Sequence, residues 1–344
     1  MTKQIRIRNL TIGGGAPIAV QSMTNLSVCD IDGTLSQVNR LSEAGCDIVR
    51  IAVPDKSSAD AFAVLRKQTT MPLVADIHFD ANLAVSAIEA GADKIRINPG
   101  NMSVAQLDKV IDCAKLNDVP IRLGVNGGSV SRALLKMHNG NRELAIEDNL
   151  RRYVTYFESK NFDNIVLSVK SSDVREMVGI NRRISNLAYP IHLGVTEAGL
   201  SYQGLVKNSV GIGALLLDGI GDTIRVSLTA DPVEEVRAAQ EILLSLNLYN
   251  GVRFVSCPKC GRCSVNLEKI AQEIYDYVKP IRKNIKIAVM GCEVNGPGEC
   301  RDADIGIAGA NGHCVFFKNG KIYKTVEEST AVAEFKREID LLSK

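Results

Sequence analysis

Tryptophan is absent from this 344-residue chain, and aromatic residues of all kinds make up only 5% of it. Proteins that bind single-stranded nucleic acid stack bases on exposed aromatic rings, so this class is disfavoured. The chain also lacks an excess of basic charge, because 41 lysines and arginines face 39 aspartates and glutamates. Residues 251–344 carry +3 (15 against 12), and the remainder carries −1 (26 against 27). Binding to a phosphate backbone needs a clustered basic excess, so we expect no nucleic-acid partner.

Long hydrophobic runs are missing as well. No apolar stretch reaches the roughly 18 residues that a transmembrane helix needs. The first eight residues are charged and lack the apolar segment of a secretory signal. We therefore expect no membrane contact and a cytoplasmic location. Hydrophobic residues nevertheless make up 45% of the chain, which excludes disorder for the bulk of it.

Short β-rich segments alternate with helical patterns from residue 17 to residue 229. The expected strands are 17–23, 47–53, 72–78, 94–98, 120–126, 164–170, 190–196 and 223–228. Helical patterns follow them, for example at 35–44, 57–67, 81–90 and 105–116. Eight such units predict an α/β fold with an N-terminal (β/α)8 TIM-type barrel over residues 1–250. An open doubly wound sheet is the alternative, but it usually has fewer strands.

The pattern changes after about residue 248. A helix is expected at 266–277, strands at 286–290 and 305–308, a hairpin around 319–320 and an amphipathic helix at 329–342. These elements predict a small α+β domain over residues 251–344, which is long enough to have its own core.

Polar side chains occupy one parity of the expected barrel strands. Residues two apart share a face, and the apolar face must meet the helices, so the polar face points to the barrel axis. The side chains on this face are Arg50, Asp76, His78, Arg96, Asn98, Arg122, Asn126, Ser168, Lys170, Arg225 and Ser227. They lie near the carboxyl ends of the strands, where barrel active sites are found.

The charges on this face do not balance. Five cations stand against two obvious anions, Asp76 and Glu197, and burying an unpaired charge costs several kcal/mol. The excess predicts a bound polyanion, and arginine forks suit phosphate oxygens. Internal salt bridges that merely hold the barrel together are the alternative. We expect substrate contacts from Arg50, Arg96, Asn98, Arg122, Asn126, Lys170, Arg225 and Ser227, and catalytic roles for Glu197, Lys170, Asp76 and His78.

Several of these residues have a second interpretation. His78 fits a core histidine as well as a catalytic one, and Glu197 fits a loop ion pair as well as a proton donor. A barrel lyase or aldolase would use Lys170 as a Schiff base.

The nine cysteines are unevenly placed, with six of them between residues 257 and 314. In a reducing compartment such a cluster more often binds metal than forms disulfides. Cys257 and Cys260 form a CxxC pair, Cys292 follows 32 residues later, and glycines surround Pro297. An iron–sulfur cluster, a structural zinc ribbon and unligated buried cysteines remain open from spacing. The cluster is favoured because the second loop has no CxxC of its own.

Seven motifs are distributed in order over nearly the whole chain. They are Gln-Ser-Met-Thr at 21–24, Ala-Asp-Ile-His-Phe at 75–79, Arg-Ile-Asn-Pro-Gly-Asn at 96–101, Gly-Val-Asn-Gly-Gly-Ser at 124–129, His-Leu-Gly-Val-Thr-Glu-Ala-Gly at 192–199, Cys-Pro-Lys-Cys-Gly-Arg at 257–262 and Gly-Cys-Glu-Val-Asn-Gly-Pro-Gly-Glu at 291–299. Together they resemble the 4-hydroxy-3-methylbut-2-enyl diphosphate synthase family in its bacterial two-domain form.

The resemblance implies an oxidoreductase of the non-mevalonate isoprenoid pathway. Its substrate would be 2-C-methyl-D-erythritol 2,4-cyclodiphosphate, which is reduced by two electrons, opened and dehydrated to the allylic diphosphate. The resemblance further implies a [4Fe–4S] cluster held by Cys257, Cys260, Cys292 and Glu299, with reduced flavodoxin or ferredoxin as electron donor. Two cysteines depart from the family pattern. Cys263 creates a ferredoxin-like C-x2-C-x2-C spacing, and Cys300 follows the predicted glutamate ligand.

The connection between the two predicted domains is short. A helix at 232–246 would run down the outside of the barrel, away from the mouth that holds the substrate. The small domain would then begin at the wrong end of its own barrel. We therefore expect a head-to-tail homodimer with active sites in trans, an arrangement that the resemblance also implies.

Overall fold

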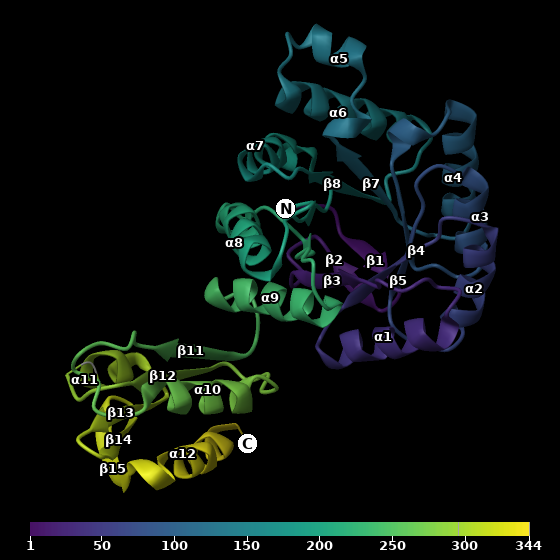
Figure 1. Cartoon of the computed structure of the whole chain (residues 1–344). Coiled ribbons are helices and arrows are strands. Elements are labelled where there is room, and N and C mark those ends of the chain that lie inside the picture. Colours follow the sequence, from purple (N-terminus) through teal and green to yellow (C-terminus); the bar gives the residue numbers. More distant parts are fainter. Residues whose placement is uncertain (295, 344) are drawn as a thin grey trace. The chain divides into compact units, whose positions relative to one another are not determined.

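Eight parallel strands curve into a barrel in the computed structural model, which describes residues 1–294 and 296–343. The sheet order is β8-β7-β6-β5-β4-β3-β10-β9, and a bridge from Leu167 to Ile191 brings its two edges together. The strands are β3 (Ala19–Met23), β4 (Ile48–Ala52), β5 (Leu73–Asp76), β6 (Lys94–Ile97), β7 (Ile121–Asn126), β8 (Ile165–Lys170), β9 (His192–Leu193) and β10 (Thr223–Ile224). Figure 1 shows the helices around them, and the predicted barrel is confirmed.

The helices begin and end at local sequence signals. They are α1 (Ile31–Glu43), α2 (Lys56–Arg66), α3 (Ala81–Glu89), α4 (Val104–Leu116), α5 (Arg132–Met137), α6 (Arg142–Ser159), α7 (Val174–Ile184), α8 (Ser201–Leu217) and α9 (Pro232–Ser245). Asp55, Asp80 and Asp173 cap α2, α3 and α7 by accepting backbone N–H bonds. Gly45 and Gly91 follow α1 and α3 with φ of 89°, a conformation that favours glycine. Among the described residues, no helix combines the length and apolarity needed to cross a membrane.

A short N-terminal hairpin, which the sequence patterns did not predict, packs against the barrel interior. It consists of β1 (Ile5–Ile7) and β2 (Leu10–Ile12), which pair antiparallel. Its isoleucines form one buried cluster with residues near the starts of four barrel strands, namely Ala19, Ile48, Val74 and Val166. The hairpin therefore covers the amino end of the barrel, and the polar residues lie beyond this apolar layer.

The chain divides into two units, Met1–Leu246 and Asn247–Lys344. The second unit contains a five-stranded sheet in the order β11-β12-β13-β14-β15, in which the first three strands are parallel and the rest antiparallel. Its elements are β11 (Val252–Ser256), α10 (Leu267–Val278), β12 (Ile285–Met290), α11 (Gly296–Glu299), β13 (Ile305–Ala310), β14 (His313–Lys318), β15 (Lys321–Glu327) and α12 (Glu328–Ser343).

Both faces of this small sheet are buried at its central strands β12 and β13. Ile285, Ile287 and Val289 of β12 pack on the face covered by α10 and α12. Ala288 and Met290 pack on the other face, in a cluster that includes Cys300. Burial on both faces explains why residues 287–290 of β12 are all apolar, and the arrangement supports the predicted α+β character.

Candidate active site and candidate metal centre

Asp76, at the end of β5, is the centre of an ion-pair network inside the barrel. Its carboxylate lies 3.6 Å from Arg50 Nε, 3.1 Å from Arg96 Nη1 and 3.5 Å from His78 Nε2. Burial alone would raise the pKa of Asp76. The charge of Arg50, the hydrogen bond with His78 and the charge of Arg96 outweigh burial and hold that pKa well below its usual range. Asp76 is therefore a permanent anion that orients two arginines.

Arg225 finds a different partner. Its Nη2 lies 2.9 Å from Oε1 of Glu235, which comes from α9 and is only 3% exposed. Ser22 Oγ donates to Glu235 Oε2 at 3.0 Å, and the backbone N–H of Leu228 donates to Oε1 at 3.1 Å. The sequence analysis missed Glu235. Its position among the buried residues of α9, beside Val236 and one turn before Ala239, is the signal that could have found it.

The predicted anion Glu197 is not part of this network among the described residues. It is exposed and adopts a φ of 52° at the turn before α8. No hydrogen bond or ion pair joins it to another described residue, so the second buried anion is Glu235. Five cations still face two acids.

Arg122 is the least compensated of these cations. It is 1% exposed, and its Nε and Nη1 have no hydrogen-bond partner within residues 1–294 and 296–343. Burial, together with the charges of Arg50 and Arg96, lowers the pKa of Arg122. Lys170 is in a similar position, because burial and then the charges of Arg50 and Arg225 lower its pKa well below the ordinary value. An anion with several oxygens would relieve both groups.

Two glycines make room for the cations. A Cβ on Gly124 of β7 would lie 2.8 Å from Arg96 Nε, and one on Gly194 would lie 2.9 Å from Lys170 Nζ. Both glycines lie on the inward face of the barrel with the polar residues. Because glycine has no side chain, the side chains of Arg96 and Lys170 can lie directly against the backbone there. The sequence analysis did not single out either glycine for this role.

The remaining predicted barrel residues contact the backbone or lie at the rim. Asn98 is 6% exposed, and its Oδ1 accepts a bond from Gly100 N at 3.2 Å, which fixes the turn after β6. Ser227 Oγ donates to the carbonyl of Val195. Asn126 ends β7 and is exposed. The strands thus bring the predicted arginines, Lys170 and Asp76 together, with the amide and hydroxyl groups around them.

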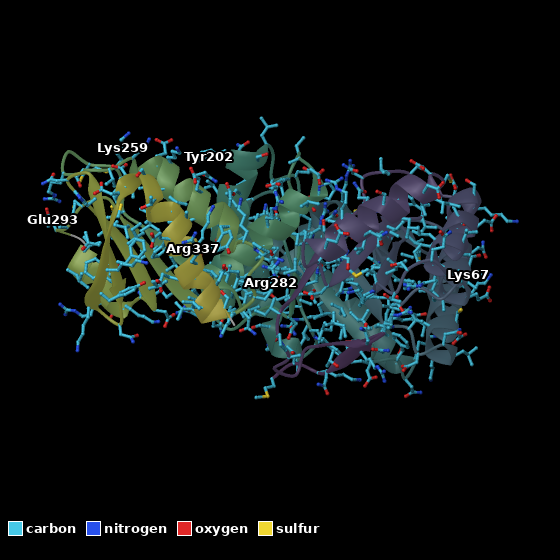
Figure 2. All side chains as sticks on the ribbon, turned by 90° about the horizontal axis from the view of Figure 1, so that it is seen from below. Lys67, Tyr202, Lys259, Arg282, Glu293 and Arg337 are labelled. Carbon is cyan, nitrogen blue, oxygen red and sulfur yellow. The ribbon has the colours of Figure 1, made fainter. Side chains whose placement is uncertain are left out.

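The cysteine-bearing loops lie at the same end of the small sheet. Cys257 follows β11 and Cys292 follows β12, and these strands are paired in register with Ser256 opposite Val289. The N–H of Gly291 donates to Cys257 Sγ at 3.2 Å. Figure 2 shows Lys259 and Glu293, one on each loop, at this end of the domain, with Arg282 toward the other.

The thiols differ in their readiness to bind metal. A backbone hydrogen bond from Arg262, together with that residue's charge, lowers the pKa of the exposed Cys260. In contrast, burial raises the pKa of Cys300 to about 12. Cys300 packs directly against Gly306 within an apolar cluster. Cys300 is therefore a core residue, whereas Cys260 has the properties of a ligand.

The donor types and their positions fit an iron–sulfur group. Cys257, Cys260 and Cys292 lie on the loops after β11 and β12, and Glu299 ends α11, which contacts β12. Within the described residues, no group of three metal-binding side chains is already gathered. The loops must therefore turn their thiolates toward a common point when such a group binds.

Comparisons with solved structures support the fold. Dihydropteroate synthase from Stenotrophomonas maltophilia matches with a TM-score of 0.54 at 14% identity, covering 72% of this chain and 98% of that one. The Yersinia pestis enzyme with a pterine-sulfa conjugate gives 0.52 at 14% identity, over 71% and 100%. At this identity the likeness concerns the barrel fold alone.

The sequence comparisons cover both domains. Residues 2–240 match the family model described as the GcpE TIM-barrel domain, and residues 253–341 match the GcpE protein C-terminal domain. A relative from Caldicellulosiruptor saccharolyticus is 50% identical over all of this chain and all of its own length. Relatives from Clostridium tetani (48%, covering 98% of each chain) and Anoxybacillus flavithermus (47%, covering 99% and 95%) are equally complete. All three are named 4-hydroxy-3-methylbut-2-en-1-yl diphosphate synthase (flavodoxin). The chain therefore belongs to the GcpE family, and the resemblance seen in its seven motifs is confirmed.

Proposed function

We propose that this protein is an iron–sulfur oxidoreductase that converts 2-C-methyl-D-erythritol 2,4-cyclodiphosphate to 4-hydroxy-3-methylbut-2-enyl diphosphate in the non-mevalonate isoprenoid pathway. The observation that carries the proposal is the pair of complementary sites in one chain. Among the described residues, the barrel holds more buried cations than acids, with donors of Arg122 left unpartnered, and the small domain presents cysteine loops with a ligand-like thiol. Its full-length relatives carry the matching name.

The barrel residues bind and orient the diphosphate. Arg122 offers phosphate oxygens two donors that lack partners among the described residues, and Lys170 offers its partly exposed amine. Asp76 and Glu235 hold Arg96, Arg50 and Arg225 in place. Asn98, Asn126 and Ser227 border this group. His78 hydrogen-bonds Arg96 and is half exposed, so it can reach a ligand at the mouth. Glu197, at the rim, is suited to donate a proton to the hydroxyl that leaves as water.

Cys257, Cys260, Cys292 and Glu299 are the proposed ligands of a [4Fe–4S] cluster. When bound, such a group supplies electrons together with a Lewis-acidic iron at the site that the carboxylate holds. The relatives' names point to flavodoxin as electron donor, and ferredoxin is the alternative. The cytoplasmic location stays a prediction.

The direction of α9 supports a homodimer with active sites in trans. Near its start, Glu235 contacts Arg225 and Ser22 inside the barrel. Further along α9, Gln240 Nε2 donates to the carbonyl of Ala44 at 2.7 Å, and Ala44 lies in the turn before β4, at the amino ends of the strands. The chain therefore leaves the barrel at the end opposite to the cations. A second copy would bring its small domain to the mouth.

The surface of α8 offers an apolar contact area for the second copy. Tyr202, Val206 and Val210 lie one turn apart and are 83%, 47% and 57% exposed, with Leu217 at the helix end. Tyr202 is labelled on the surface in Figure 2. Exposed apolar stripes of this kind are typical of subunit interfaces.

Subunit mixing tests the proposal. One parent carries Arg96→Ala with Arg122→Ala, which disables the barrel, and the other carries Cys260→Ser, which disables the cluster. With random exchange, half of the dimers are mixed, and each mixed dimer contains one site built from two intact halves. Roughly a quarter of wild-type activity should return in trans. Activity that stays at the sum of the parents would contradict the trans arrangement. A purified wild-type protein without iron and sulfide would contradict the redox function itself.

A further inference from the structure

Lys94 is a buried titratable group that the proposed reaction does not use. It begins β6 on the same face as Arg96, is 0% exposed, and its Nζ has no hydrogen-bond partner in the described part of the chain. In the strand register it lies opposite Val74, which belongs to the apolar layer over the N-terminal hairpin. Lys94 therefore lies at the floor of the polar interior, below the arginines.

The groups around Lys94 are nearly all cations. Burial, followed by the charges of Arg122 and Arg50, lowers its pKa well below the ordinary value. The other charged or titratable groups that the described residues place in the interior are Arg96 of β6, Lys170 of β8, His192 of β9, Arg225 directly after β10, Asp76 of β5 and Glu235 of α9. Both acids among them are already engaged by arginines. Among the described residues, no free acid remains to hold an ammonium group at this position, so the buried site disfavours the charged form of Lys94 in the ligand-free barrel.

The ligand changes this balance. Each phosphoryl group of a cyclic diphosphate carries one ester and one anhydride bond, so it retains a single, strongly acidic oxygen. A phosphate monoester has a second pKa of about 6, but the cyclic ligand has no such proton to exchange near neutral pH. The ligand therefore brings two negative charges that do not change near neutral pH. Any net uptake or release of protons on binding must then occur at groups of the protein.

We propose that Lys94 takes up a proton when the diphosphate binds, so that the floor of the barrel becomes cationic only in the complex. The inference rests on the proposed function, because it needs an anion among the arginines. A neutral Lys94 adds no further buried charge to the ligand-free barrel. The protonated amine adds a positive charge only when the anion is bound.

Two neighbours are weaker candidates for the same proton. His192 is also fully buried, with Nε2 unpartnered among the described residues, but an imidazole has an ordinary pKa about four units below that of an amine. In equal surroundings the amine regains its proton first. Burial and neighbouring cations lower the pKa of Lys170 as well, but Lys170 ends β8 and is partly exposed, so its charge costs less than a charge on the fully buried Lys94.

Linkage fixes the sign of the effect. A proton taken up on binding makes the affinity for the diphosphate rise as the pH falls, by up to tenfold per pH unit while Lys94 is neutral in the free protein. Removal of the amine should abolish this slope.

Calorimetric titration of the cluster-loaded protein with the cyclic diphosphate tests the inference. At about pH 8, in buffers of different ionisation enthalpy, the wild type should take up close to one proton per site. Lys94→Met should bind more weakly and take up almost none. The control, Lys109→Met, removes an exposed amine on α4 that donates to Asn82, and it should match the wild type.

The outcomes separate the two proposals. Absence of any binding by the wild type would refute the proposed function. Binding without proton uptake, or uptake that persists in Lys94→Met and disappears in Lys170→Met or His192→Gln, would refute the role of Lys94 alone. Should Lys94→Met fail to fold, Lys94→Gln and the wild-type proton count decide the question. We expect Lys94→Met to melt no lower than the wild type, because it replaces an unpartnered buried amine by an apolar group of similar length.

Discussion

The barrel and the small domain prepare their sites in opposite ways. In the barrel, strand register and burial fix Arg50, Arg96 and Asp76 against one another without any ligand. In the small domain, Cys260 is exposed on a loop, and no group of three ligands is gathered within the described residues. The sheet fixes the positions of side chains on strands, whereas ligands on loops reach their final positions only when the metal binds. Substitutions should therefore weaken the barrel site by degrees and abolish the loop site outright.

The largest effect is expected at the cluster ligands. Cys257→Ser, Cys260→Ser and Cys292→Ser should each lose the cluster and all activity, because a hydroxyl is a poor iron ligand. Iron and sulfide counts after anaerobic purification, with the visible spectrum, measure the loss.

The matched controls are the two extra cysteines. Cys300→Ser and Cys263→Ser should keep roughly the wild-type iron content, since Cys300 is a core thiol and the glutamate supplies the fourth ligand. A protein that bleaches with Cys263→Ser, while Glu299→Ala keeps its spectrum, would mean that the fourth ligand is Cys263.

A large loss of stability is expected at the centre of the barrel network. Asp76→Asn leaves Arg50 and Arg96 without their buried anion and should lower the free energy of unfolding by about 3–5 kcal/mol. Because the pKa of Asp76 is depressed in the fold, its contribution is complete above the ordinary value of 3.8 and is lost as the pH falls below it. Urea unfolding from pH 7 down to about pH 2 should show the onset of this loss below about pH 4 in the wild type and not in the variant.

Asp108→Asn provides the surface comparison for that experiment. Asp108 pairs with Lys160 at a partly exposed position, so its loss should cost less than about 1 kcal/mol. Equal losses from the two variants would show that the network around Asp76 does not hold the barrel together.

A moderate effect is expected at the barrel cations that we propose contact the diphosphate. Arg96→Ala, Arg122→Ala and Lys170→Ala should each weaken binding of the cyclic diphosphate roughly tenfold to a hundredfold and leave the iron content unchanged. Arg237→Ala, at an exposed ion pair on α9, should bind like the wild type. Unchanged affinity in all three barrel variants would favour the internal salt-bridge interpretation.

The smallest effect is expected from a single methyl group on the barrel wall. Gly124→Ala places a Cβ 2.8 Å from Arg96 Nε, so the arginine must shift, and affinity should fall by about threefold to tenfold. Gly213→Ala on α8 has nothing within 4 Å of the added Cβ and should not change affinity. Wild-type affinity in Gly124→Ala would show that the position of Arg96 tolerates displacement.

Local periodicity accounts for what the sequence analysis predicted well. The alternation of strand and helix patterns predicted the barrel, and the parity of β6 and β7 predicted that Arg96 and Arg122 face the axis. Such features depend on residues two to four positions apart, so the chain itself determines them. The CxxC spacing is local in the same sense and favoured an iron–sulfur group over zinc without any tertiary information, whereas Glu299 as a ligand was implied by the family resemblance.

Contacts between distant segments are what only the tertiary structure decided. Whether Arg225 meets Glu235 or Glu197 depends on how α9 packs, and the two acids are equally available in the sequence. The hairpin under the barrel and the bare backbone at Gly124 depend on barrel closure and strand register. Lys94 reads as one more polar residue of a strand, yet closure of the barrel leaves its amine buried without an acid among the described residues. The physical reason is that periodicity assigns a side chain to a face, whereas its charge state depends on every element that closes over that face.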